Sequence, residues 1–494
     1  MKTQIARGRR IAAQTVSGAV MASFAFVGVA LADTDNIQKN TQVNVPAIAI
    51  NGAASGVAGC TPTSFSFDIS WIDPFVHGYF LADRTHGSSA TDGDVMVIDT
   101  SNPAGGAKFL SNTNDTMAGI RCDKNAAFGG TGAAGRNEIT GPNGAFTVNH
   151  TEVWVGDGPG KFALPAAETN TAADYNNDQC DSSVRVFDLL SGAETDHINV
   201  GGCFRTDEGA FDPVDQVALF ANPSEQPGIK NGKAPLNNTP YITLISTIPV
   251  AGGPITAPGA TNRHRIIKQI NFDGTHGTPL ADGGIEQASY SFKTGLFYIA
   301  FPSTVEPPYN AGGGVAVVDP TGDADDIRVV KVFSTPGCSP NGSALGPDNE
   351  LFLGCGNPPG NGPQQVIDIR NGHLIAKIAG TNGGCDEVAF NAGDDHFAGA
   401  CTEGGATDNL DVSDADPVTG ALDLQHNTGA AGAHSIAADP VKESSNSTAS
   451  FWMPMFQGDC GAGIACVVVY ASTGGDDPSE FVVEAAEDHH RDNR

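Results

Sequence analysis

Pairs of acidic or amide side chains stand immediately before several short apolar stretches of this chain. They are Asp207-Glu208 before GAFDPVDQVALFAN, Glu286-Gln287 before ASYSFKTGLFYIAF, and Asp386-Glu387 before VAFNAGDDHFAGAC. Oxygen ligands that converge from several segments bind hard cations such as Ca²⁺, and a carboxylate with a shifted pKa can act as a general acid or base. These pairs are therefore the first candidates for a functional site, provided that the fold brings them together.

The segments that must position these pairs are short strands joined by tight turns. Runs of Val, Ile, Phe and Tyr alternate with clusters of Gly, Pro, Asn and Asp, a pattern typical of many short strands. A strand–turn–strand unit recurs at 67–83, 142–157, 207–222, 286–301, 341–356, 386–401 and 434–454. In most copies a second hairpin follows, and its first strand ends in Asp, as in VMVID at Asp99 and VAVVD at Asp319.

Two hairpins per unit predict a series of four-stranded antiparallel sheets. A propeller blade of this kind needs about 40–50 residues, so the later copies are minimal and the earlier ones carry inserted loops. One such sheet cannot bury both of its faces alone, so neighbouring sheets must stack and close into a ring. The predicted fold class is all-β, a seven-bladed β-propeller with blades starting near residues 68, 142, 207, 286, 341, 386 and 434.

Four segments are expected along the chain. Residues 1–32 combine a cationic start, an apolar run and a small-residue site at Ala30-Leu31-Ala32, which is the layout of a cleavable signal peptide. Residues 33–59 form an N-terminal segment that could pair with the last blade, residues 60–486 form the propeller, and residues 487–494 form a disordered tail. We expect a periplasmic or secreted protein with no membrane span after signal cleavage. The sequence does not specify its oligomeric state.

In a propeller the innermost strand of each blade starts at one face, here called the top face, beside the central channel. The second strands return to the same face, so both sets of ends surround the predicted channel mouth. The candidate ligand-binding residues chosen on this basis are Asp68, Asp83, Arg84, His86, Asn143, Asp157, Arg205, Asp207, Asn222 and Gln287. The arginines could hold a carboxylate-bearing ligand or neutralise neighbouring acids, and the sequence leaves both roles open.

The ten cysteines of an exported chain predict disulfides rather than metal-binding or redox thiols. From their places in the repeat, most of these disulfides should tie together elements of the top face. The expected pairs are Cys338–Cys355, Cys385–Cys401, Cys180–Cys203, Cys60–Cys122 and Cys460–Cys466. No CxxC or CxxCH spacing is present, which excludes zinc-ribbon sites and c-type haem.

The charge of the chain excludes further classes of partner and cofactor. A net charge of −30, from 56 acidic and 26 basic residues, is unsuited to binding nucleic acid or anionic lipid. The sequence contains no P-loop, no dinucleotide-binding fingerprint and no GxSxG elbow, so neither a nucleotide cofactor nor a serine-hydrolase site is expected.

The Asp-ended hairpins, preceded by strands rich in Phe or Tyr and Ala, resemble the YVTN-type and lactonase-like seven-bladed propellers over nearly all of the chain beyond residue 32. Propellers similar to the gluconolactonase and paraoxonase type hold a metal at the top of the channel with Glu, Asn and Asp. By residue type, this resemblance implies Ca²⁺ or another divalent metal held by Glu208, Glu286, Asn341 and Asp386.

Two functions are compatible with this mouth. The first is an exported propeller that binds a small ligand, a divalent cation or a partner protein at the top face. The second is a metal-dependent hydrolase of lactone or ester type, or a lyase, in which the metal polarises a carbonyl and His434 or Glu387 is the base. The lack of a contiguous catalytic motif favours binding, and whether the chain is an enzyme stays open at this point.

Overall fold

The structure is a computed structural model in which every described residue belongs to one compact unit, Asp35–Arg494. It describes residues 37–45, 65, 67–84, 93–110, 117, 121–122, 136–137, 141–158, 182–201, 205–223, 239–250, 263–281, 284–304, 307–356, 362–380, 383–403, 407–415, 418–429, 434–441 and 449–472. The expected signal peptide and tail therefore lie outside the described residues. Within the described part, no helix is long and apolar enough to cross a membrane.

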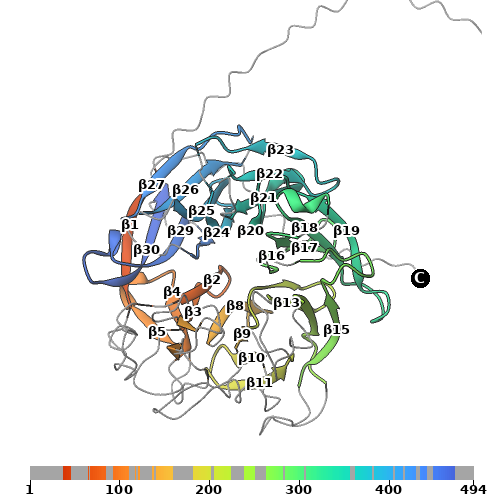
Figure 1. The fold of residues 1–494 in the computed structure, drawn as a ribbon. Coiled ribbons are helices and arrows are strands. Elements are labelled where there is room, and N and C mark those ends of the chain that lie inside the picture. Colours follow the sequence, from red (N-terminus) through yellow and green to blue (C-terminus); the bar gives the residue numbers. More distant parts are fainter. Residues whose placement is uncertain are drawn as a thin grey trace, which may run out of the picture. The chain divides into compact units, whose positions relative to one another are not determined.

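Seven sheets of four antiparallel strands surround a central channel, as the sequence predicted (Figure 1). From the innermost strand outward, blade 1 consists of β2 (Phe67–Asp73), β3 (Gly78–Asp83), β4 (Asp94–Asp99) and β5 (Ala107–Phe109); blade 2 of β8 (Pro142–Val148), β9 (Glu152–Asp157), β10 (Ser183–Asp188) and β11 (Glu194–Asn199); and blade 3 of β12 (Gly209–Asp212), β13 (Val217–Asn222), β14 (Tyr241–Ser246) and β15 (Arg265–Asn271).

The remaining blades follow the same plan. Blade 4 consists of β16 (Ala288–Ser291), β17 (Leu296–Phe301), β18 (Gly314–Asp319) and β19 (Arg328–Ser334); blade 5 of β20 (Pro340–Leu345), β21 (Glu350–Cys355), β22 (Gln365–Asp368) and β23 (Leu374–Lys377); blade 6 of β24 (Cys385–Asn391), β25 (His396–Glu403), β26 (Thr407–Asp414) and β27 (Leu424–Asn427); and blade 7 of β28 (Ala437–Asp439), β29 (Ser450–Phe456), β30 (Ala465–Ser472) and β1 (Ile37–Asn44). A separate hairpin joins β6 (Arg121–Cys122) to β7 (Arg136–Asn137), and short 3-10 turns lie at Pro103–Gly105, Tyr309–Ala311, Pro347–Asn349 and Gly458–Cys460.

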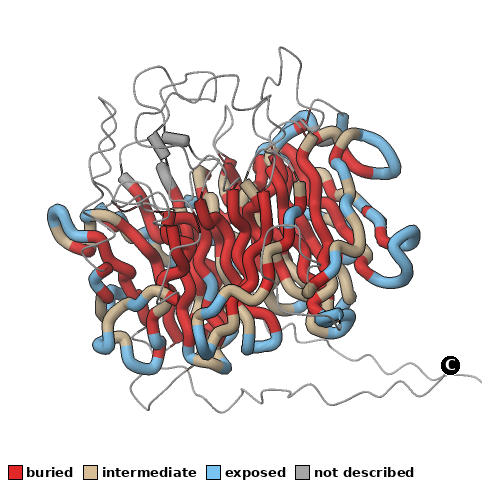
Figure 2. Tube along the Cα trace, turned by 90° about the horizontal axis from the view of Figure 1, so that it is seen from below, coloured by how far each residue is buried: buried red, intermediate tan, exposed pale blue. Residues whose placement is uncertain are grey.

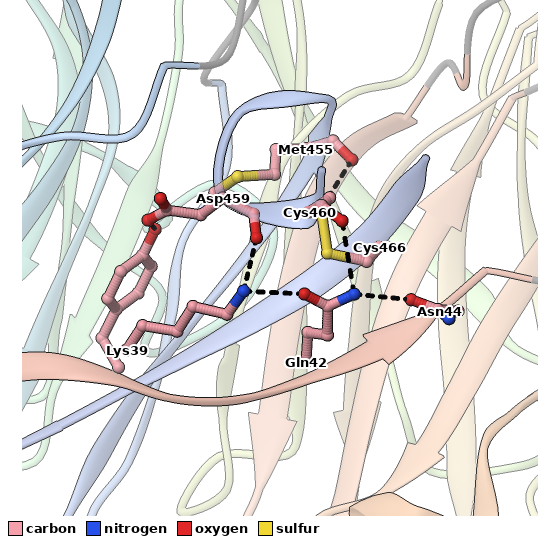
Figure 3. Close-up of a disulfide and its surroundings, with 8 residues drawn as sticks. Lys39, Gln42, Asn44, Met455, Asp459, Cys460 and Cys466 are labelled. Atoms are coloured by element: carbon pink, nitrogen blue, oxygen red, sulfur yellow. Dashed lines mark hydrogen bonds between the residues drawn. A yellow bond between two sulfur atoms is a disulfide. The ribbon is translucent and has the colours of Figure 1, made fainter. Parts of the chain in front are cut away.

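The last blade is completed by β1, a strand from near the start of the chain. Strand β1 pairs antiparallel with β30, from Ile37 opposite Ser472 to Asn44 opposite Cys466. Figure 3 shows how side chains fasten this strand: Lys39 donates to the carbonyl of Asp459, and Gln42 Nε2 donates to the carbonyl of Cys460 at 3.4 Å. The sequence left open whether the N-terminal segment 33–59 pairs with the last blade. In the structure, β1 from this segment is the outermost strand of blade 7.

The recurring Asp at the end of the third strand of a blade has a structural role. Asp99 Oδ1 accepts from the backbone N–H and hydroxyl of Ser101, and Asp319 Oδ1 accepts from those of Thr321. Such Asx turns replace backbone hydrogen bonds where the strand stops, which explains why Asp recurs at this position. These turns lie on the bottom face, opposite the channel mouth.

Contacts between blades are apolar and largely aromatic. Trp452 of blade 7 stacks on Tyr79 of blade 1 at 5.5 Å between ring centroids, and Phe397 of blade 6 stacks on Phe352 of blade 5 at 4.8 Å. Figure 2 shows that the strands between the two faces are buried, whereas exposure is concentrated in the turns at the edges. Every sheet therefore has both faces covered by neighbours, as the ring requires.

Three of the expected disulfides are present. Cys338–Cys355 and Cys385–Cys401 join the start of an inner strand to the end of the second strand in blades 5 and 6, and Cys460–Cys466 closes a short loop in blade 7. The pairs Cys180–Cys203 and Cys60–Cys122 involve residues outside the described part. Cys338–Cys355 and Cys385–Cys401 confirm the prediction that disulfides tie together elements of the top face.

Glycines allow the backbones of neighbouring blades to approach closely at the channel. A Cβ added at Gly144 or Gly156 of blade 2 would lie 2.5 Å from the carbonyl oxygen of Asp207 in blade 3. In the same way, a Cβ at Gly342 of blade 5 would lie 2.5 Å from the carbonyl oxygen of Asp386 in blade 6. The acidic pair of blade 3 thus lies against glycines of blade 2, and the acidic pair of blade 6 lies against a glycine of blade 5.

We expect Gly156→Ala to lower the free energy of unfolding by about 1–3 kcal/mol, because the new methyl group meets backbone that cannot yield without moving the inner strand of blade 3. Thermal and denaturant unfolding measure this loss. Gly105→Ala, where the nearest atom is 3.3 Å away on the Asn102 side chain, is the matched control and should change stability by less than about 0.5 kcal/mol. Equal stability of the two variants would contradict the close approach.

Candidate binding site at the channel mouth

The polar pairs lie in irregular segments at the start of the inner strands. The pairing of inner and second strands shifts between Phe67 and Ser70 in blade 1, between Pro142 and Ala145 in blade 2, and between Cys385 and Val388 in blade 6. The residues skipped by these shifts are the polar ones and their neighbours. A bulge of this kind redirects side chains. Here it turns them toward the channel and the adjacent blades.

Two consecutive residues at the start of the inner strand occupy equivalent positions in every blade. The first position of blades 1 to 7 is occupied by Asp68, Asn143, Asp207, Glu286, Asn341, Asp386 and His434. The second position is occupied by Ile69, Gly144, Glu208, Gln287, Gly342, Glu387 and Ser435. Long polar side chains therefore come from the second position of blades 3, 4 and 6 only, and the glycines of blades 2 and 5 leave room for them.

Side chains at the first position form a polar belt that runs from blade to blade. His434 bridges two carboxylates, with Nε2 2.5 Å from Asp68 Oδ1 and Nδ1 2.5 Å from Asp386 Oδ2. Asn341 donates to the other oxygen of Asp386 at 3.1 Å. This part of the belt connects blades 5, 6, 7 and 1.

Arginine and asparagine continue the belt in the other direction. Arg84 Nη1 donates to Asp68 Oδ2 at 2.8 Å and to Asn143 Oδ1 at 3.0 Å. Asn143 donates in turn to the carbonyl of Thr206 at 3.3 Å, and Arg205 pairs with Asp207. Of the two roles that the sequence left open for Arg84 and Arg205, the structure shows neutralisation of neighbouring acids.

Below the belt, the second-position side chains meet across the channel. Gln287 of blade 4 donates from Nε2 to Glu387 Oε2 of blade 6 at 2.7 Å, and its own oxygen accepts from the Ser343 backbone of blade 5 at 2.6 Å. Glu208 of blade 3 interacts with Glu387 from the other side. Two carboxyl oxygens in this group, Glu208 Oε2 and Glu387 Oε1, are buried and receive no hydrogen bond from another donor, so only a proton held by the pair itself can join them.

The electrostatics of the belt favour charged side chains. Burial lowers the pKa of His434, but the charges of Asp386 and Asp68 outweigh it and hold this pKa well above its usual value. Burial likewise opposes ionisation of Asp68 and Asp386, yet Arg84 and His434 respectively bring their pKa values below the usual range. The belt therefore carries an imidazolium between two carboxylates at neutral pH.

The glutamates below the belt behave in the opposite way. Burial and the charge of Glu387 raise the pKa of Glu208 well above its usual value, and Asp207, Glu286 and Asp386 add to the effect. Burial and Asp386 do the same for Glu387. Ionisation of both carboxyl groups is therefore disfavoured unless a cation compensates their charge, so the pair holds a proton to higher pH than an ordinary glutamate.

Other predicted ligand residues are used in the scaffold. Asp157 is buried and accepts from Arg185 Nε at 3.1 Å, and Asn222 is held by Thr206 and Thr243 at 3.0 Å each. Asp83 is buried at the end of β3. The predicted residue His86 lies outside the described part of the chain.

The meeting of Glu208 and Glu387 was missed by the sequence analysis, which assigned the first as a metal ligand and the second as a base. A signal was present: both follow Asp in the same DE pair, and the preceding blades 2 and 5 share Pro-Asn-Gly in the inner strand and Gly in the second. Among the described residues, a separate compact group of metal-ligand type contains Cys385, Cys401 and Asp411, but its sulfurs are joined in a disulfide and offer no thiolate.

No protein-family model matches this chain, and none of the curated proteins matches it. Among solved structures, it is similar to a chain described as "Crystal Structure of Mitotic Checkpoint Complex", with 10% sequence identity and a TM-score of 0.47 over 95% of this chain and 99% of that one. A likeness this distant carries no argument about function. The assignment of a seven-bladed propeller rests on the sheets themselves.

Replacing the bridging imidazolium should weaken the fold in a defined pH window. We expect His434→Gln to lower the free energy of unfolding by about 2 kcal/mol, less than for a fully buried pair because 32% of the His434 side chain is exposed. The stability that protonated His434 contributes is fully present below the unfolded pKa of 6.5 and is lost as pH rises through the raised pKa of the folded state. The stability that ionised Asp68 and Asp386 contribute is fully present above the unfolded pKa of 3.8 and is lost as pH falls through their lowered folded pKa values.

The difference between wild type and His434→Gln should therefore be largest near pH 5–6 and should shrink on both sides, as measured by denaturant unfolding from pH 3 to pH 9. His426→Gln removes a more exposed pair with Asp459, 2.8 Å apart, and is the matched control with an expected loss below about 1 kcal/mol. A pH-independent loss in His434→Gln would contradict the bridge.

A variant that lacks one of the buried glutamates should be more stable than the wild type at high pH. Because the folded pKa of Glu208 is raised, the folded state binds more protons than the unfolded state above about pH 4.5, and stability falls as pH increases toward the folded value. Glu208→Gln does not titrate. We expect its Tm to equal that of the wild type near pH 4 and to exceed it by at least about 2 °C at pH 8. A Tm of Glu208→Gln below that of the wild type at pH 8 would contradict the raised pKa of Glu208.

Proposed function

We propose that this protein is a binding propeller whose channel mouth takes a divalent cation, most suitably Ca²⁺. The observation that supports the proposal is the pair of buried oxygens, Glu208 Oε2 and Glu387 Oε1, which no other donor reaches and which lie in a channel where further carboxylates raise the pKa of both groups. A hard cation would supply the positive charge that this group lacks, and it prefers carboxylate and amide oxygens.

The residues present fit such an ion in part as the sequence implied. Glu208 and Glu286 keep their expected role, since both belong to the carboxylate group around the channel. Asp386 and Asn341 are bonded to each other and to His434, so they would support the site by holding the belt. Glu387, expected as a base, joins Glu208 as a ligand in this proposal.

Binding is favoured over hydrolysis by the surroundings of the two candidate bases. His434 is an imidazolium between two carboxylates and has no lone pair with which to accept a proton, and Glu387 would itself be a ligand of the proposed cation. A lactonase, esterase or lyase needs a positioned group that is unprotonated at working pH. The three disulfides fit an oxidising compartment, so we place the binding function in the periplasm or outside the cell.

Calorimetric titration of chelator-treated protein with Ca²⁺ tests the cation site. We expect one ion per chain at saturation and an affinity at least about tenfold lower in Glu208→Gln, because a neutral amide replaces a charged ligand. Asp325→Asn, which removes an exposed acid from the bottom face, is the control and should leave the affinity unchanged. Binding that is equal in wild type and Glu208→Gln would refute the site.

The same preparations, with and without Ca²⁺, should show no turnover of a panel of lactones and aryl esters. Turnover that needs the metal and disappears in Glu208→Gln would replace the binding proposal by the hydrolase.

A further inference from the structure

The bottom face carries a row of bulky side chains that the channel mouth does not use. In blades 1 to 4 the inner strand is joined to the second strand by a tight turn on this face, and the tips of these turns in blades 1, 3 and 4 are Phe75, Val214 and Phe292. Their exposed fractions are 75%, 69% and 74%. Turn tips are normally polar, so three exposed apolar tips in four consecutive blades call for a partner surface.

The turn of blade 2 completes this row with a histidine. The His150 ring contacts Phe75 at 4.5 Å between centroids, and its Nδ1 lies 2.7 Å from Asp73 Oδ2, which is buried. Thr147 donates to the same carboxylate oxygen at 2.8 Å. The imidazole is therefore fixed against the exposed phenyl ring.

Further bonds lock the adjoining turns to one another. Asn149 of blade 2 and Gln216 of blade 3 exchange two side-chain hydrogen bonds, of 2.8 and 3.2 Å. In blade 4, Tyr290 packs edge-on against Phe292 at 5.4 Å and interacts with Asp212 of blade 3. The four turns form one preorganised surface, which loses little conformational entropy on binding. We call Phe75, His150, Val214, Asp215 and Phe292 the bottom patch.

The centre of the bottom patch has a local excess of negative charge. Asp212 is fully buried, accepts from the backbone N–H groups of Val214 and Asp215, and interacts with the Tyr290 hydroxyl of blade 4. Burial and the charges of Asp212 and Asp319 raise the pKa of exposed Asp215. Lys293, on the same turn as Phe292, is exposed and does not offset three carboxylates. The bottom patch therefore combines apolar turn tips with an exposed acid, Asp215, in a locally acidic setting.

We propose that the bottom patch docks a polypeptide segment of a partner protein in which Arg or Lys alternates with bulky apolar residues. The apolar residues would pack between Phe75, Val214 and Phe292, and a basic side chain would approach the exposed carboxylate of Asp215. A guanidinium group also stacks well on aromatic rings, which favours Arg.

The net charge of the chain favours a basic segment over a second copy of the chain or an anionic lipid surface. A second copy of the chain would bring another −30 to the interface, and an anionic lipid surface would be repelled in the same way. A basic segment is attracted by that field. The patch lies on the face opposite the cation site, so this proposal does not depend on the proposed function.

Fluorescence anisotropy of a labelled ten-residue peptide of alternating leucine and arginine provides the test. We expect binding that weakens as salt increases, and a loss of about five- to tenfold in affinity for Phe292→Ser, Val214→Ser and Asp215→Asn. These residues are at exposed turn tips, and unchanged Tm values would show that the variants fold. Chelation of Ca²⁺ should leave the affinity unchanged.

Two controls separate a docking surface from general attraction to an acidic protein. Leu190→Ser and Asp325→Asn alter an exposed apolar residue and an exposed acid elsewhere on the bottom face, and each should change the affinity less than about twofold. Equal losses in patch and control variants would overturn the proposal, as would equal binding of a peptide with glutamate in place of arginine. Sedimentation that shows dimers abolished by Phe292→Ser would assign the patch to a second copy instead.

Discussion

The structure depends on one packing constraint: each four-stranded sheet must bury both faces against its neighbours. Around a closed ring, this constraint is most severe beside the channel, where the inner strands crowd together. The chain meets it with glycine at Gly144, Gly156 and Gly342, each of which lies where a Cβ would be 2.5 Å from a neighbouring carbonyl oxygen. Bulged pairing at the start of the inner strands follows from the same crowding, because a bulge lets the strand bend away while its polar side chains turn inward.

That constraint also decides the electrostatics of the channel. Polar side chains turned inward at the bulges are removed from water, and buried charges must find partners. Charged side chains at the first position find such partners, because His434 bridges Asp68 and Asp386 and Arg84 donates to Asp68. At the second positions, Gln287 donates to Glu387, but two glutamate oxygens receive no hydrogen bond from another donor. In the belt, Arg84 Nε is also buried without a partner. Buried carboxyl oxygens that only their own proton can join are expected where a ligand completes the site.

Local sequence patterns predicted the parts of the fold that local chemistry determines. Strand periodicity, turn residues and the Asp-ended hairpins were sufficient for seven blades, and the repeat placed Cys338–Cys355 and Cys385–Cys401 correctly. Long-range pairing was not accessible in this way. The pairing of β1 with β30 joins segments more than 400 residues apart, and the contact of Glu208 with Glu387 joins two non-neighbouring blades. Pairing of arginines with acids likewise required the positions of the second-strand ends.

The two faces of the ring use their acidic residues in different ways. At the top, arginine and histidine neutralise most of the belt, so the net charge of −30 says little about that face. On the bottom, many aspartates cap turns with one oxygen and leave the other toward solvent, as Asp99 and Asp319 do. Acidic turns therefore accompany the apolar turn tips on the bottom face. Since the turn chemistry itself calls only for Asp, and not for Phe75, Val214 or Phe292, the apolar tips are the feature that folding alone does not explain.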